Sequence, residues 1–150
     1  MIYLEVVKDI FTVSDDYYFA QCISADFAMG KGIAVEFNKR FDTKSNLVRI
    51  YDSYLFKWDS EFKECVPCIL EGRVFNLITK RNYWNKPTYN TMKDALIAMK
   101  YYVENSCCIT KIAMPIIGCG LDGLSWPKVK AIIQTVFADS NIEILVCKQE

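Results

Sequence analysis

Glycine, lysine and aspartate gather where strand-like stretches of this chain end, and these residue types could bind or cleave a phosphate-bearing ligand. Five of the six glycines lie in two short runs, residues 28–33 and 117–123. Glycine has no Cβ, so its backbone N–H groups can approach a ligand closely. Each run precedes a helix-like stretch, whose N-terminus adds the partial positive charge that suits phosphate. The two runs therefore indicate either a cradle for a diphosphate or two tight strand-to-helix turns.

Lys80 and Asp122 are the candidate catalytic residues. Lys80 ends an apolar stretch, where a lysine is either a solvated strand terminus or a partly desolvated amine that attacks a masked aldehyde such as C1 of a ribose. Asp122 lies inside the second glycine run, as a turn residue or as a general acid or base that faces the sugar. The chain has no histidine. Ser-His and Cys-His nucleophile pairs are therefore excluded.

The length and composition predict one domain over residues 1–150. Of these residues 52% are hydrophobic, and the formal net charge is zero, which gives no global attraction to nucleic acid. No apolar run is long enough to span a membrane, and the seven cysteines lack the spacing of a disulfide scaffold, so we expect a cytoplasmic protein with reduced thiols. Cys65 and Cys68 form a lone C-x-x-C pair that we interpret as hairpin residues. We expect no metal and no cofactor.

Strand-like and helix-like stretches alternate along the chain, which is typical of an α/β sandwich with a mainly parallel or mixed sheet. The region 42–62 is mixed and aromatic, with room for a short helix. Asp9, the loops 24–32 and 118–123, and Thr79 with Lys80 each follow a predicted strand. Parallel strands would bring these groups to one edge of the sheet, where ligands of open α/β sheets bind. We predict strands at residues 2–7, 17–24, 65–70, 74–79, 111–116 and 142–147, and helices over residues 30–41, from Asn90 or Thr91 to 104, and from the Ser125 cap through Phe137.

Five stretches together resemble the macro domain family, whose members bind ADP-ribose, and its terminal ADP-ribose protein glycohydrolase branch in particular. They recur in the family's order and span most of the chain. The resemblance implies a three-layer α/β/α fold with ADP-ribose at the sheet edge. Ser24-Ala25-Asp26 replaces the asparagine-rich motif of other macro hydrolases, which argues against their water-activating mechanism. The stretches are Val7-Lys8-Asp9-Ile10-Phe11, residues 22–34, Leu77-Ile78-Thr79-Lys80-Arg81, Lys86-Pro87-Thr88-Tyr89 and residues 114–126.

The resemblance also implies roles for single residues. Asp9 would hold the adenine amine and Ile10 would pack beside the base. Lys80 matches the lysine that attacks C1 of the distal ribose in that branch, and Asp122 matches the carboxylate that assists release of the modified group. The other implied ligand contacts are Ser24, Met29, Gly30, Gly32, Ile33, Thr79, Ile117, Gly118, Cys119, Gly120 and Leu121.

The expected function is removal of mono-ADP-ribose from acidic side chains or nucleotide bases. Two alternatives remain open, a phosphatase acting on ADP-ribose 1″-phosphate and a non-catalytic reader of ADP-ribose, because one fold hosts all three. The expected partner is ADP-ribose or an ADP-ribosylated macromolecule, with no membrane. The basic and aromatic loop 80–86 leaves direct contact with nucleic acid open. We expect a monomer.

The role implied for Asp9 generates a first prediction. Replacing it in Asp9→Ala removes a charge-assisted hydrogen bond to the adenine amine. Binding of free ADP-ribose should therefore weaken by roughly 1–3 kcal/mol. Titration calorimetry with ADP-ribose, ADP and AMP measures the effect, and wild-type affinity in the variant would contradict the role.

Overall fold

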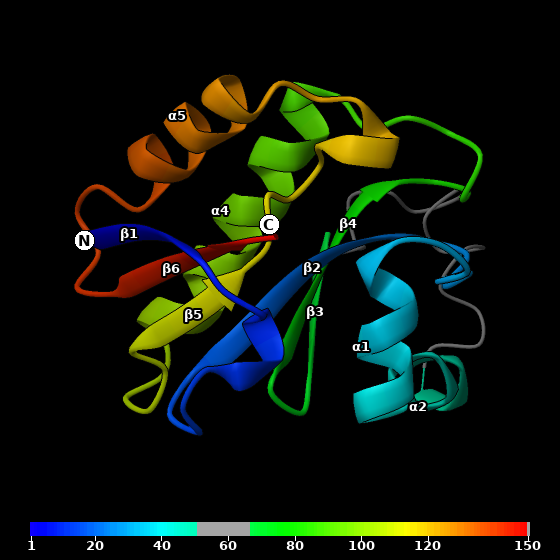
Figure 1. The fold of residues 1–150 in the computed structure, drawn as a ribbon, viewed down its shortest axis with the longest axis horizontal. Coiled ribbons are helices and arrows are strands. Elements are labelled where there is room, and N and C mark those ends of the chain that lie inside the picture. The colour runs from blue at the N-terminus through cyan, green and yellow to red at the C-terminus, as the bar shows by residue number, and fades with distance from the viewer. Residues whose placement is uncertain (51–66, 150) are drawn as a thin grey trace.

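A six-stranded sheet forms the centre of residues 1–50 and 67–149, the part of the chain that the computed structural model describes (Figure 1). The strand order is β1-β6-β5-β2-β4-β3. All neighbouring strands pair in parallel except β3, which is antiparallel to β4, so the expected mixed and mainly parallel sheet is confirmed. In chain order the elements are β1 (Ile2–Val7), η1 (Ile10–Thr12), β2 (Tyr18–Ser24), α1 (Ile33–Phe41), α2 (Thr43–Ile50), β3 (Cys68–Glu71), β4 (Val74–Lys80), α4 (Tyr89–Glu104), β5 (Lys111–Met114), η3 (Gly120–Asp122), α5 (Trp126–Val136) and β6 (Glu143–Lys148).

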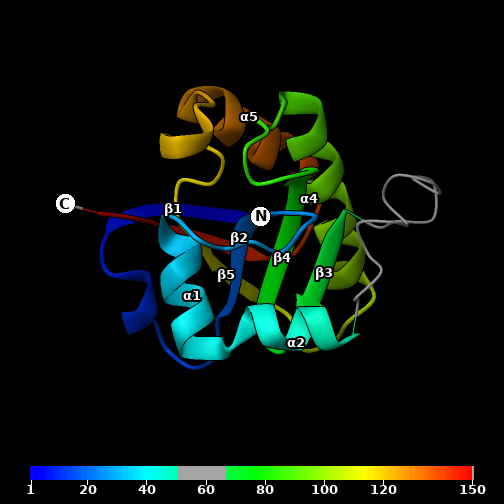
Figure 2. The ribbon, with the colours of Figure 1, turned by 90° about the vertical axis from the view of Figure 1, so that its right-hand side faces the viewer.

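Helices cover both faces of the sheet, which confirms the three-layer α/β/α arrangement. Helices α4 and α5 lie on one face, and α1 and α2 lie on the other (Figure 2). Phe75 and Leu77 of β4 pack in the apolar cluster of α4 and α5, whereas Ile78 packs in the cluster of α1 and α2. Because both faces are covered, β4 is a nearly continuous buried run rather than an alternating one.

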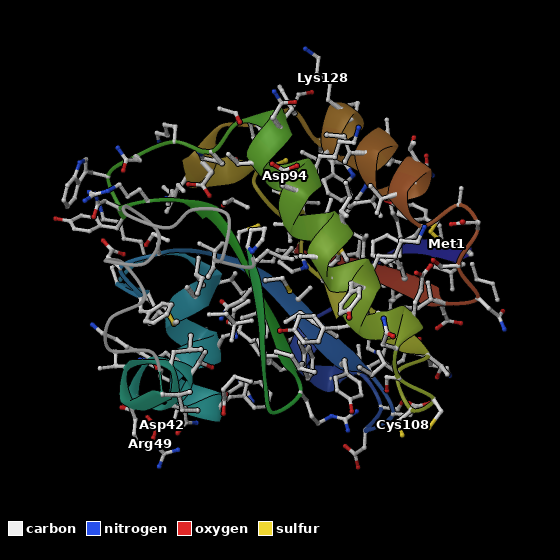
Figure 3. All side chains as sticks on the ribbon, turned by 180° about the vertical axis from the view of Figure 1, so that it is seen from behind. Met1, Asp42, Arg49, Asp94, Cys108 and Lys128 are labelled. Atoms are coloured by element: carbon white, nitrogen blue, oxygen red, sulfur yellow. The ribbon has the colours of Figure 1, made fainter. Side chains whose placement is uncertain are left out.

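Helix α4 shows how its sequence pattern directs packing. Its apolar residues recur at three- and four-residue spacing and form one stripe toward the sheet. Seen from behind, the helix crosses over the strands of the sheet (Figure 3). Tyr102 lies beside this stripe and is only partly buried. The buried residues of the stripe are Met92, Ala95, Leu96, Met99 and Val103.

Several predicted boundaries are wrong by a few residues. Helix α1 begins at Ile33 rather than Gly30, because Gly32 precedes it with φ +65°, outside the helical region. Helix α4 is capped by Thr88 rather than Asn90 or Thr91. The Thr88 hydroxyl accepts from the Thr91 amide at 3.1 Å, and the Thr91 hydroxyl accepts from the Thr88 amide at 3.0 Å. This reciprocal pair satisfies two amides that the first turn leaves free.

The strand boundaries differ from the predictions by at most two residues where they can be compared. For example, β5 ends at Met114 rather than at residue 116, and β6 spans Glu143–Lys148 rather than 142–147. Ser125 precedes α5, as predicted, but its side chain makes no capping hydrogen bond, and Pro127 lies in the first turn of the helix.

The short helix expected within 42–62 is α2, and residues 51–62 lie outside the described residues. Cys65 also lies outside them, so the hairpin interpretation of the C-x-x-C pair is testable only at Cys68, which begins β3. No described helix has the length and apolarity needed to cross a membrane.

A cluster around Glu5 joins β1 to β6 and α5. One carboxylate oxygen lies 2.8 Å from the Lys130 amine and the other lies 2.6 Å from the Lys148 amine. The Tyr3 hydroxyl donates to the same carboxylate at 2.9 Å. These donors stabilise the charged form and lower the pKa of Glu5 from an ordinary 4.5 to about 2.

The lowered pKa of Glu5 predicts how its contribution to stability depends on pH. A lowered folded pKa adds stability above pH 4.5, and this contribution is lost as the pH falls through about 2. Glu5→Gln should therefore reduce the free energy of unfolding by roughly 1–2 kcal/mol at pH 7. The difference between the two proteins should shrink between pH 4.5 and 2. Urea unfolding across this range tests the expectation, and a difference independent of pH would contradict it.

Candidate functional site

The five parallel strands end at one edge of the sheet, and the candidate site residues follow them there. Asp9 comes after β1, Ser24 ends β2, Lys80 ends β4, and the second glycine run follows β5. This is the shared edge that the sequence predicted. The two glycine runs therefore lie on neighbouring strand ends, although about 90 residues separate them in the chain.

The sheet divides at this edge between β2 and β5. Their ladder pairs only Tyr18 with Ile112 and Phe19 with Ala113. Toward their carboxyl ends the two strands diverge, and β2 continues to α1 on one face while β5 leads to α5 on the other (Figure 1). This is a topological switch point, where open α/β sheets place their ligands.

The first glycine loop connects β2 to α1 through strained backbone. Phe27 has φ +56° and Met29 has φ +47°, both in the left-handed region that non-glycine residues rarely adopt. Such residues cost of order 1–3 kcal/mol each and persist only where their surroundings fix them. Both side chains are buried, which anchors the loop. Gly30 lies between them and the helix, and a methyl group placed on it would meet no atom within 4 Å, so there is open space at its Cα.

The second glycine loop reaches toward the first. A methyl group placed on Gly32 would lie 3.7 Å from Leu121 Cδ1, so the two loops face each other. Gly118 packs tightly, because a methyl group there would lie 2.5 Å from Met92 Cε and 3.0 Å from Leu124 Cδ1. Gly120 begins η3 with φ +74° and has open space around its Cα. Gly118 therefore serves packing, whereas Gly120 is free to face a ligand.

Lys80 and Asp122 form a direct ion pair. The Lys80 amine lies 2.7 Å from Asp122 Oδ1, and the two side chains are 14% and 17% exposed. The ladder of β2 and β4 shifts here, because Ile23 pairs with Ile78 and the next residue, Ser24, pairs with Lys80. Such an irregularity re-aims the side chains of a strand. If the side chains of β4 alternated regularly, Lys80 would lie on the same face of the sheet as Ile78, beneath α1 and α2.

The other predicted contacts are placed as follows. Asp9 caps η1, accepting from the Phe11 amide at 3.0 Å, and its side chain remains exposed. Ile10 is buried beside Phe19 and Phe37.

The Ser24 hydroxyl donates to the Asp26 carboxylate. Thr79 is fully buried. Met29 and Ile117 are buried at the loop bases, whereas Ile33, Cys119 and Leu121 retain exposed surface.

Asp9 lies apart from the ion pair. In the strand order, β6, β5 and β2 separate β1 from β4. The structure therefore brings together Lys80, Asp122 and the two glycine loops, and it places Asp9 with Ile10 at the far end of the same edge.

Three residues that organise the site were assigned no role from the sequence. Asp26 accepts from the Tyr83 amide at 3.0 Å and thereby links the loop after β2 to the loop after β4. The Lys86 amine donates to the Leu121 carbonyl oxygen. Tyr89 accepts at its hydroxyl from the Ser125 amide at 3.0 Å. Each contact joins segments at least 35 residues apart, so no local pattern could have revealed it.

Two thiols near the ion pair are kept protonated. Burial, and secondly the negative charge of Asp122, raise the pKa of Cys22 far above its usual range. The same two causes raise the pKa of Cys119. A thiol acts as a nucleophile only as thiolate, so neither cysteine is suited to that role. Among the described residues no group of three acidic or cysteine side chains converges to hold a metal ion.

Comparison with known proteins identifies the family. No protein-family model matches the chain. The chain is 37% identical over 143 residues to human ADP-ribose glycohydrolase OARD1, in an alignment covering 94% of this chain and 88% of the relative. The bovine protein of the same name matches equally. The chain belongs to the macro domain family.

Solved structures agree with this assignment at the level of the fold. The macrodomain of Mycobacterium tuberculosis DarG superposes with a TM-score of 0.74 at 17% identity, covering 99% of this chain and 98% of that one. Thermosipho africanus DarTG in complex with ADP-ribose superposes with a TM-score of 0.69 at 21% identity, covering 98% of this chain and 41% of that one.

The open space at Gly120 predicts which substitutions of this macro domain would block a ligand. Gly120→Glu adds bulk and negative charge where a diphosphate would lie, and ADP-ribose binding should be lost. Gly120→Ala is the matched control, because both variants share the strain of the positive φ but only one adds charge. Calorimetry measures affinity, and thermal unfolding checks that both variants fold. Near-normal affinity in Gly120→Glu would show that the loop is only a turn.

Proposed function

We propose that this protein is an ADP-ribose glycohydrolase that cleaves the bond between the distal ribose and a modified group, with Lys80 as nucleophile. The observation that carries the proposal is the ion pair of Lys80 and Asp122 at 2.7 Å, on the edge where both glycine loops meet. An amine and a carboxylate provide the nucleophile and the proton-transfer partner for this reaction without a histidine. The human relative, at 37% identity, is named for ADP-ribose glycohydrolase activity.

The spacing of the site residues supports an elongated ligand. Asp9 follows β1 and Lys80 ends β4, and these two strands lie four inter-strand spacings apart, or roughly 19 Å. A ligand that reaches both must extend along the edge, with its central part at the switch point between β5 and β2. ADP-ribose fits with adenine at Asp9, the diphosphate between the glycine loops and the distal ribose at Lys80.

The proposed reaction starts with separation of the ion pair. Asp122 accepts a proton from the Lys80 ammonium, and the free amine attacks C1 of the distal ribose. The bond from C1 to the modified group breaks, and that group leaves with the bonding electron pair, as a carboxylate where an acidic side chain is modified. The nitrogen of the adduct loses a proton to water, and the ribose ring opens to give a Schiff base on Lys80. Water then hydrolyses this C=N bond, which releases ADP-ribose and frees the amine, and Asp122 returns its proton to Lys80.

The modified group distinguishes the alternatives within this proposal. We expect release of ADP-ribose from modified acidic side chains or nucleotide bases, whereas turnover of ADP-ribose 1″-phosphate would indicate a phosphatase. A release assay should offer glutamate-linked ADP-ribosyl protein, ADP-ribosylated DNA and ADP-ribose 1″-phosphate side by side. We expect release from at least one of the two ADP-ribosylated macromolecules. Binding of ADP-ribose without release from any of the three would identify a reader and overturn the proposal.

Substitution of Lys80 tests the nucleophile directly. Lys80→Ala should abolish turnover yet leave ADP-ribose binding largely intact, because the lysine contributes a reacting atom rather than most of the contacts. Borohydride during turnover should trap ADP-ribose covalently on the wild type and not on the variant. Lys100→Ala is a control, since Lys100 lies on α4 and pairs with Asp139 at 2.6 Å. A fully active Lys80→Ala protein would exclude the lysine mechanism.

A further inference from the structure

Asp26 has both of its carboxylate oxygens occupied by donors from two separate segments. Oδ1 accepts from the Ser24 hydroxyl and from the Ala28 amide at 3.1 Å, within the first glycine loop. Oδ2 accepts from the Tyr83 amide at 3.0 Å, in the loop that follows β4. Hydrogen bonds to a carboxylate are stronger than those between neutral groups. Asp26 therefore ties the first glycine loop to the segment that begins at Lys80.

The backbone of Lys80 is held from the same side. The Ala25 amide donates to the Lys80 carbonyl oxygen at 2.9 Å, immediately beyond the register shift. Together with the bond from Tyr83 to Asp26, this contact fixes the segment 80–83 at both ends. The position from which the Lys80 side chain extends is thereby set by the loop after β2.

The charge of Asp26 needs a physical explanation. A carboxylate beside a loop that holds a diphosphate repels the ligand, so a bare aspartate is unfavourable there. Three donors offset that charge, and in return they fix a loop in which Phe27 and Met29 both have positive φ. Strained backbone of this kind persists where hydrogen bonds and packing over-determine it.

We propose that Asp26 is a positioning residue, which couples the first glycine loop to the Lys80 segment and so sets the nucleophile against the bound ribose. The inference rests on the proposed glycohydrolase function. Asp26 touches neither the substrate nor the reacting atoms. It acts through the Tyr83 amide and through the backbone of its own loop. The alternative is that Asp26 is only a turn residue whose loss lowers stability.

The variant Asp26→Asn separates these two roles. Its amide oxygen can keep the Ser24 and Ala28 donors, whereas its amino group faces the Tyr83 amide, so only the link to the Lys80 segment is lost. We expect kcat to fall by about tenfold to a hundredfold, as for a misplaced reacting group, while ADP-ribose affinity stays close to that of the wild type. Asp26→Ala removes all three contacts, so both kcat and affinity should fall.

Three measurements decide the outcome. They are kcat and KM, the calorimetric affinity for ADP-ribose, and hydrogen exchange of the Tyr83 amide, which should lose protection in Asp26→Asn. Asp139→Asn is the control, since this aspartate pairs with Lys100 outside the site. Wild-type kcat in Asp26→Asn, or a loss of rate explained fully by a smaller folded fraction, would overturn the proposal.

Failure of the proposed glycohydrolase function can be distinguished from failure of the Asp26 link. A wild-type protein that binds ADP-ribose but releases it from no substrate would remove the glycohydrolase assignment. Hydrogen exchange needs no turnover, so it would still decide on the Asp26 link. Unchanged protection of the Tyr83 amide in Asp26→Asn would overturn the link itself.

Discussion

The candidate site depends on the separation of β2 from β5 after only two paired residues. Because the connections of these neighbouring strands leave toward opposite faces, the two glycine loops meet at the point where the strands part. Strands that remained paired to their ends would need their backbone groups for the ladder. Here the switch point leaves loop amides and helix N-termini at one edge, where the positive ends of peptide dipoles gather.

The Lys80 ammonium and the Asp122 carboxylate impose a second constraint, because both side chains are mostly buried. A mostly buried lysine without a partner would be costly, and so would a mostly buried aspartate. The ion pair at the end of β4, where the ladder with β2 shifts, offsets both costs, because Lys80 lies within 2.7 Å of Asp122. A ligand that separates the pair must compensate for the lost attraction. In the proposed reaction, proton transfer from the ammonium to the carboxylate neutralises both groups and removes the charges themselves.

Aspartates within phosphate-binding loops are electrostatically unexpected, and this protein has two at the predicted cradle. In each case the carboxylate already accepts from a donor of the protein. Three donors surround Asp26 and the Lys80 amine faces Asp122. In the proposed function, the backbone amides of the two loops would attract the diphosphate, since the net charge of the whole chain is zero.

The sequence by itself determined the fold class, the parallel strands, the apolar stripe of α4 and the clustering of both glycine runs at one edge, because these follow from local periodicity and from the rule that parallel strands end together. It also identified Lys80 and Asp122 as candidate catalytic residues from their residue types and positions. Only the tertiary structure decided that they form a direct pair, since 42 positions separate them in the chain. The contacts of Asp26 with Tyr83 and of Lys86 with Leu121 were equally beyond a sequence pattern. They join loops distant in the chain through backbone groups, which every residue carries and no residue type reveals.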